Sequence, residues 1–102
     1  MSVIMGLRLS VNREQFEQAA NSDPARLQAI SNRGKQHGAI HHQFYANLAG
    51  DEILVVDEWP DAESFQRFFE ASPDIGEMMG EAGVTNESHP EFWQAIDTPD
   101  KF

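Results

Sequence analysis

The sequence predicts an α+β domain in which amphipathic helices pack on an antiparallel sheet. The most informative stretch runs from Glu52 to Phe69, where an apolar strand is followed almost directly by a helix. Ile53 to Val56 is a short apolar run, typical of a strand covered on both faces. Trp59-Pro60-Asp61 then stops the extended segment, and Asp61 offers a helix N-cap. Apolar side chains recur after it at helical spacing, at Phe65, Phe68 and Phe69.

The N-terminal segment predicts an inner strand followed by a helix. Ser2 to Leu9 is apolar on both of its alternating faces, as expected for a central strand of a sheet. Asn12 and Gln15 form an N-capping pair three residues apart, so a helix is expected to begin at about Arg13.

A second helix is expected to start at Pro24, because proline suits the first position of a helix. Leu27 and Ile30 would face the core from this helix. Gly34 and Gly38 are expected to end it, since glycine disfavours helix interiors and often follows the last helical residue.

The segment from Ala39 to Leu48 predicts an edge strand. Its side chains alternate between an apolar face, which includes His42, and a largely polar face. Ala49-Gly50-Asp51 has the length and chemistry of a hairpin connection. This strand is therefore expected to pair antiparallel with Ile53 to Trp59.

The C-terminal part predicts one more helical piece and one more strand. Ser72-Pro73-Asp74 restarts helical structure and Gly83 ends it, and Glu91 to Ile96 is expected to form the last strand. Residues 1–102 thus form one domain, a ferredoxin-like βαββαβ sandwich with a four-stranded antiparallel sheet. Because the first and third strands are apolar on both faces, they are expected in the middle of the sheet.

Composition restricts the partners of the protein. Seventeen acidic and seven basic side chains give a formal charge of -10, which repels nucleic acids and anionic membranes, so neither is an expected partner. The chain has no cysteine, no membrane-spanning apolar stretch and no secretory signal, so a cytoplasmic protein is expected. The 40% hydrophobic content favours an oligomer that hides part of an apolar sheet face.

A resemblance to a known family rests mainly on the end of the third predicted strand and the helix start after it, Val56-Asp57-Glu58-Trp59-Pro60-Asp61-Ala62-Glu63-Ser64-Phe65. With the element order and length, this segment resembles the dimeric α/β barrel superfamily, in particular its antibiotic-biosynthesis-monooxygenase-like domains. In that family the sheets of two subunits meet and close a barrel, with the helices outside. The resemblance implies a homodimeric α/β barrel here.

Members of this family include cofactor-independent oxygenases of polycyclic phenols and quinols, haem-degrading enzymes, and small proteins with no assigned activity. The fold alone does not choose among them. The haem-degrading members use an Asn, Trp and His constellation, which the resemblance places at Leu7, Phe68 and Met78. All three are apolar here, so the resemblance speaks against haem degradation and leaves an apolar pocket.

His42 is the candidate catalytic residue, because it shares the apolar face of its strand with Ile40 and Phe44. A neutral imidazole there would take a proton from a phenolic substrate and leave an electron-rich anion able to react with dioxygen. The more common alternative is a structural histidine satisfied by one backbone carbonyl or a water.

The candidate substrate pocket for a small aromatic ligand is apolar and consists of Trp59, Phe65, Phe68, Met78 and Trp93. Side chains of these types at these spacings are more often core. No metal or cofactor site is expected. His41 and His42 point to opposite faces of a regular strand, and Asp57 and Glu58 do the same.

Three functions remain open at this point. The leading hypothesis is a homodimeric monooxygenase that acts on a phenolic or quinol-type small molecule without metal or flavin. The alternative is a non-catalytic homodimer that binds a small apolar ligand or has a structural role. A third is a dimeric module of a larger assembly.

Overall fold

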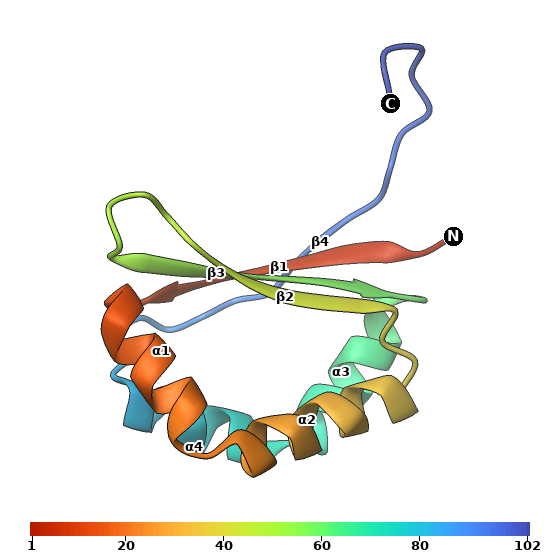
Figure 1. Ribbon diagram of the computed structural model, residues 1–102. Helices are drawn as coiled ribbons and strands as arrows, with labels where there is room; N and C mark the ends of the chain where they lie inside the picture. The colour runs from red at the N-terminus through yellow and green to blue at the C-terminus, as the bar shows by residue number, and fades with distance from the viewer.

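The computed structural model of residues 1–102 contains one antiparallel four-stranded sheet with all four helices on one face (Figure 1). In chain order the elements are β1 (Val3–Ser10), α1 (Arg13–Ser22), α2 (Pro24–Gln36), β2 (His41–Ala46), β3 (Glu52–Trp59), α3 (Ala62–Glu70), α4 (Pro73–Ala82) and β4 (Glu91–Trp93). The strands lie in the order β2-β3-β1-β4. The predicted ferredoxin-like α+β fold is confirmed, with β1 and β3 in the middle.

Two helices begin where their capping residues predict. The Asn12 side chain accepts a hydrogen bond from the Gln15 backbone N–H at 3.1 Å, and α1 begins at Arg13. The Asp61 side chain accepts one from the Ser64 backbone N–H at 2.7 Å, at the start of α3. Each cap satisfies a backbone donor that the first helical turn leaves without a partner.

The end of α2 differs from the prediction. Gly34 lies inside the helix and is buried, and a Cβ added there would contact the Phe68 ring at 3.7 Å. The small residue thus lets α2 lie close to α3. The helix continues to Gln36, and Gly38, with φ at 101°, then turns the chain towards β2.

Two strands and one helix also depart from expectation. β2 and β4 are shorter than predicted, and β4 stops at Trp93 because only three of its residues pair with β1. In α3, Phe65 and Phe68 are buried whereas Phe69 is exposed. Two phenylalanines, not three, therefore form the core stripe of this helix.

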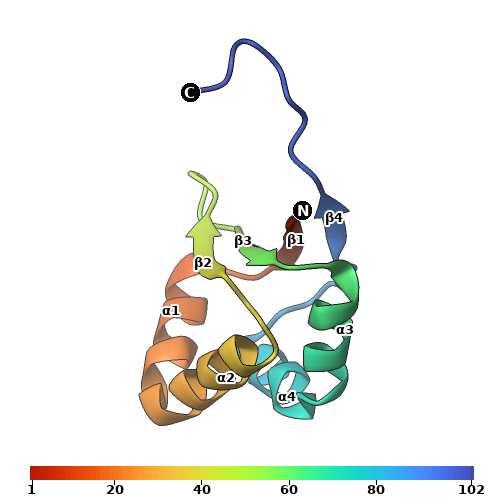
Figure 2. The ribbon, with the colours of Figure 1, turned by 90° about the vertical axis from the view of Figure 1, so that its right-hand side faces the viewer.

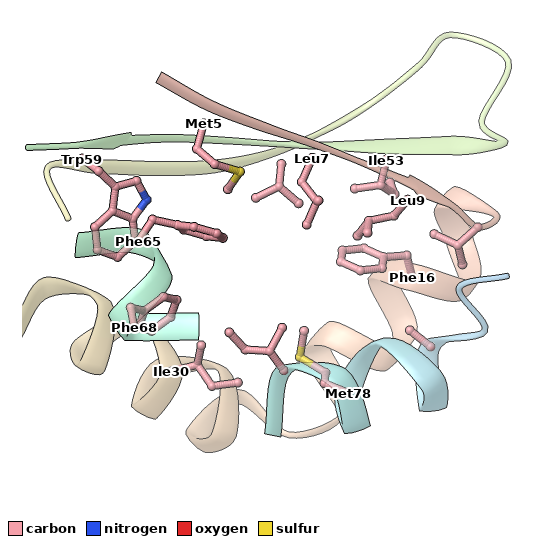
Figure 3. Packing of buried hydrophobic residues seen from close by; sticks show 14 of the residues in the cluster. Met5, Leu7, Leu9, Phe16, Ile30, Ile53, Trp59, Phe65, Phe68 and Met78 are labelled. Carbon is pink, nitrogen blue, oxygen red and sulfur yellow. The ribbon is translucent and has the colours of Figure 1, made fainter. Parts of the chain in front are cut away.

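The core lies between the sheet and the helices (Figure 3). Alternate residues of the two inner strands point towards the helices and are buried, among them Met5, Leu7, Leu9, Ile53 and Val55. The helices contribute Phe16, Ile30, Phe65, Phe68, Ile75 and Met78. The strict alternation in β1 and β3 means that one face of each inner strand supplies the core.

The opposite face of the sheet carries no helix (Figure 2). Four large side chains on it are between 38% and 59% exposed, namely Ile4, Tyr45, Leu54 and Trp93. Within the single chain the inner strands are covered on one face alone, because all four helices lie on the same side. The C-terminal tail after β4 rises away from the sheet on this open side (Figures 1 and 2).

An ion pair joins α2 to α4. The Arg33 guanidinium donates to both carboxylate oxygens of Asp74, at 2.8 and 3.0 Å, and to the hydroxyl of buried Ser72 at 2.9 Å. Ser72 in turn donates to the Phe68 carbonyl oxygen at 2.6 Å. The hydrogen bonds from Arg33 lower the pKa of Asp74 below its ordinary value, against the opposing effect of burial. The ionised form of Asp74 therefore stabilises the fold.

Replacing Asp74 by Asn is expected to lower the free energy of unfolding by about 1 kcal/mol at neutral pH, because a partly exposed bidentate pair is lost. Since the folded-state pKa of Asp74 lies below its unfolded-state value, its contribution is complete above an unfolded pKa of about 3.9. It disappears as the pH falls through the folded pKa. Urea unfolding of wild type and Asp74→Asn at a series of acidic pH values measures the difference between their free energies of unfolding. This difference should shrink as the pH falls.

The matched control is Glu70→Gln, which neutralises an exposed carboxylate that makes no ion pair. It should leave the free energy of unfolding nearly unchanged at every pH. If the free energies of unfolding of wild type and Asp74→Asn differed by the same amount down to low pH, the assigned role of Asp74 would be contradicted.

Candidate active site

The hairpin of β2 and β3 places His42 directly opposite Asp57. Residues that face each other across an antiparallel pair lie on the same side of the sheet, and these two lie on the helix side. A turn over residues 48–51 fixes the register. The Asn47 backbone N–H donates to the Glu52 carbonyl at 3.1 Å, and the Asn47 side-chain oxygen accepts from the backbone N–H groups of Asp51 and Glu52 at 3.0 Å.

Asp57 holds His42 and is itself held by Trp59. The His42 Nδ1 atom lies 2.7 Å from Asp57 Oδ1, and Trp59 Nε1 donates a hydrogen bond to Asp57 Oδ2 at 3.1 Å. The side chain of Asp57 is 8% exposed and that of His42 is 43% exposed. The carboxylate of Asp57 is therefore held inside the core, whereas the imidazole of His42 is partly exposed.

A cavity of about 700 Å³ opens between the sheet and the helices beside His42. Most of its lining is apolar, and it includes the predicted residues His42, Trp59, Phe65, Phe68 and Met78. In Figure 3, Met5 and Leu7 point from the sheet, and Phe68 and Met78 from the helices, towards the open space between the layers. The volume falls within the range of small-molecule pockets, about 300–1,000 Å³.

Trp93 does not line this cavity, so its assignment to the pocket is wrong. It pairs with Ile4 of β1 and lies on the open face of the sheet, where it is largely exposed. Its neighbour Phe92 faces the core instead, with its ring 5.7 Å from that of Phe65. The three residues of β4 alternate between the two faces, and only the pairing with β1 decides which of the two aromatic residues points inwards.

The positions that the family resemblance assigns to haem chemistry also line the cavity. Leu7, Phe68 and Met78 present apolar side chains there. Asp57 and Glu58 lie on opposite faces, as predicted, and Glu58 accepts a hydrogen bond from the Ser2 hydroxyl at 2.5 Å. No group of three or more His, Cys, Asp or Glu side chains comes close enough together to hold a metal ion.

Asp57 is the site residue that the sequence analysis missed. Strand alternation places it on the helix side, but its partner depends on the hairpin register. A connection limited to Ala49-Gly50-Asp51 would put Leu48 opposite Glu52, whereas Asn47 pairs with Glu52 in the structure. This difference of one residue decides what faces His42. Asn47 was the sequence signal for the correct register. Asparagine side chains commonly close turns by binding backbone N–H groups further along the chain.

Solved structures that resemble this chain share its fold. The cofactor-independent oxygenase SnoaB from Streptomyces nogalater matches with a TM-score of 0.65 at 14% identity, over 98% of both chains. A monooxygenase from the gene ActVA-Orf6 of Streptomyces coelicolor, in complex with nanaomycin D, has a TM-score of 0.70 at 13% identity, over 95% of this chain and 89% of that chain. A dimeric ferredoxin-like protein from an uncultured marine organism has a TM-score of 0.68 at 14% identity, over 99% and 93%.

The chain has the fold of these oxygenases. The resemblance to antibiotic-biosynthesis-monooxygenase-like domains, drawn from the sequence, is thereby confirmed for the fold. Comparisons with protein-family profiles and with curated proteins give no match. None of the four helices combines the length and the apolar character that crossing a membrane requires. Assignment of an activity therefore depends on the site.

Trp59 lines the cavity and Trp93 does not, so the two indoles of the chain should respond differently to an aromatic ligand. In Trp93→Phe, which keeps Trp59, we expect a naphthoquinone to quench tryptophan fluorescence in a saturable manner. In Trp59→Phe, which keeps Trp93, quenching should rise linearly with concentration, as for random collisions. Fluorescence titration of both variants measures this. Saturable quenching of Trp93 alone would contradict a ligand site in this cavity.

Proposed function

We propose that this chain is a cofactor-independent monooxygenase that acts on a phenolic or quinol-type small molecule. The observation that carries the proposal is the placement of one imidazole, anchored through Nδ1 to a buried carboxylate, at the wall of an apolar cavity. The oxygenases with the same fold support the reaction type. The apolar lining suits a flat aromatic ring, which displaces water from the cavity on binding.

The proposed reaction begins with proton transfer from the substrate hydroxyl to His42. The electron-rich phenolate passes one electron to dioxygen, and the two radicals combine to form a carbon–oxygen bond at a ring carbon. The resulting peroxide loses water. One atom of dioxygen becomes the new quinone carbonyl oxygen, and the other leaves as water with two hydrogens from the substrate. Dioxygen is the oxidant, so the balance needs no further electron donor.

His42→Phe is expected to lower the turnover of a hydroquinone in air by roughly 10²-fold or more, the usual contribution of a general base. His89→Phe is the control, because His89 is exposed and does not line the cavity. It should keep wild-type turnover. Oxygen consumption and the incorporation of one atom of isotopically labelled dioxygen into the product are measured over a panel of naphthols and hydroquinones.

Two outcomes of this experiment would contradict the enzymatic proposal. One is turnover by His42→Phe equal to that of wild type, and the other is a wild type that binds the ring compounds and oxidises none of them. Binding without oxidation would favour the alternative function, a dimer that holds a small apolar ligand and performs no chemistry.

We also infer a homodimer that forms through the open face of the sheet. Its exposed apolar side chains are Ile4, Tyr45, Leu54 and Trp93, and contact with a second copy would remove them from water. Two solved structures with this fold are of proteins described as dimeric. Pairing two open faces would cover these side chains and produce the dimeric α/β barrel.

Leu54→Lys is expected to convert a micromolar dimer into a monomer, because it would bury a second unpaired cation beside its cross-strand neighbour Arg8. Leu48→Lys is the matched control, since Leu48 is fully exposed in the hairpin turn. Light scattering coupled to size-exclusion chromatography gives the mass of each species. A monomeric wild type, or a dimeric Leu54→Lys variant, would contradict the inferred interface.

A further inference from the structure

We propose that Asp57 is the positioning residue of this site: it selects the His42 tautomer that carries its proton on Nδ1 and leaves Nε2 as the basic atom. The inference rests on the proposed function, because it specifies which atom would accept the substrate proton. It concerns a residue that neither the sequence pattern nor the fold comparison assigned to the site.

The direction of the Asp57 carboxylate follows from Trp59. An indole N–H can only donate a hydrogen bond, so the Asp57 oxygen it contacts at 3.1 Å must accept. Trp59 is almost fully buried and packs against the rings of Phe65 and Phe68, with centroids 5.7 and 5.3 Å away. These ring contacts hold the indole, and its N–H orients one carboxylate oxygen of Asp57.

The second oxygen of the carboxylate then faces His42. An ionised carboxylate has only acceptor oxygens, and a neutral imidazole has one donor nitrogen and one acceptor nitrogen. The 2.7 Å contact between Asp57 Oδ1 and His42 Nδ1 therefore requires the proton to lie on Nδ1. The unprotonated atom of the neutral ring is Nε2, on the other side of the imidazole, as in the histidines of hydrolase triads.

The charge on Asp57 also favours proton transfer. His42 is the only cationic or titratable partner in an ion-pair contact with this buried carboxylate. When His42 accepts a proton, a lone buried charge becomes a hydrogen-bonded ion pair. A hydrogen bond between two ionised groups is stronger than one between neutral groups. Asp57 thus stabilises the imidazolium as well as orienting the ring.

The decisive variant is Asp57→Asn, which is nearly isosteric. Because Trp59 still donates, the amide oxygen of Asn must face Trp59, and the amide NH₂ must then face His42. His42 Nδ1 becomes an acceptor and the proton moves to Nε2. In the double variant Asp57→Asn with Trp59→Phe, the indole donor is gone and the amide can turn over, so both tautomers of His42 should be populated.

The experiment is long-range proton–nitrogen NMR of the histidine rings, which distinguishes the two tautomers, at a mildly alkaline pH of about 8.5 where a histidine is neutral. We expect the Nδ1–H form of His42 in wild type and in Trp59→Phe, the Nε2–H form in Asp57→Asn, and a mixture of the two forms in the double variant. The backbone spectrum shows in each case whether the fold is kept.

Turnover of a hydroquinone provides the second measurement. Asp57→Asn should lose roughly 10²–10⁴-fold in kcat with little change in KM, because the base is absent while the cavity is kept. The double variant should recover part of this loss.

The NMR result does not depend on turnover. A wild type with no oxygenase activity would therefore overturn the proposed function and leave the tautomer assignment standing. An Nε2–H tautomer in wild type, or an unchanged Nδ1–H tautomer in Asp57→Asn, would overturn the role of Asp57 even in an active enzyme.

Discussion

The antiparallel pairing of β2 with β3 is the constraint on which the rest of this structure depends. It places His42 opposite Asp57 on the helix side and extends to the edge strand the apolar face that the inner strands β1 and β3 form together. A shift of one residue would move every side chain of β2 to the other face of the sheet. The turn closed by Asn47 prevents this shift, and a loop remote from the cavity thereby controls the composition of the site.

The space between the layers is bounded by rigid rings. Trp59, Phe65 and Phe68 pack together at one end, and Phe16 lies at the other (Figure 3). The Phe16 ring contacts that of Phe44 at a centroid distance of 5.0 Å. An empty volume in a core lowers stability, because the side chains around it lose van der Waals contacts. Aromatic clusters offset part of that loss. Packing and the proposed chemistry thus use the same side chains.

The two faces of the sheet have different roles. The helix side carries the cavity, His42 and the buried carboxylate, whereas the other side carries exposed apolar residues, and the C-terminal tail extends away from it (Figures 1 and 2). The acidic side chains of the helices, among them Glu14, Glu63 and Glu77, are exposed to water. The open face is mixed, because Arg8 and Glu58 lie on it beside the exposed apolar side chains.

The sequence alone determined the order of the elements, the ends of most helices and the position of the inner strands, because caps such as Asn12 and Asp61 and the alternation in β1 are local signals. It also identified His42 and four of the residues that line the cavity. Only the tertiary structure decided that Asp57 faces His42 and that Trp93 lies outside the cavity. Both depend on strand register, which is fixed by hydrogen bonds between segments and leaves no mark on the periodicity of either strand.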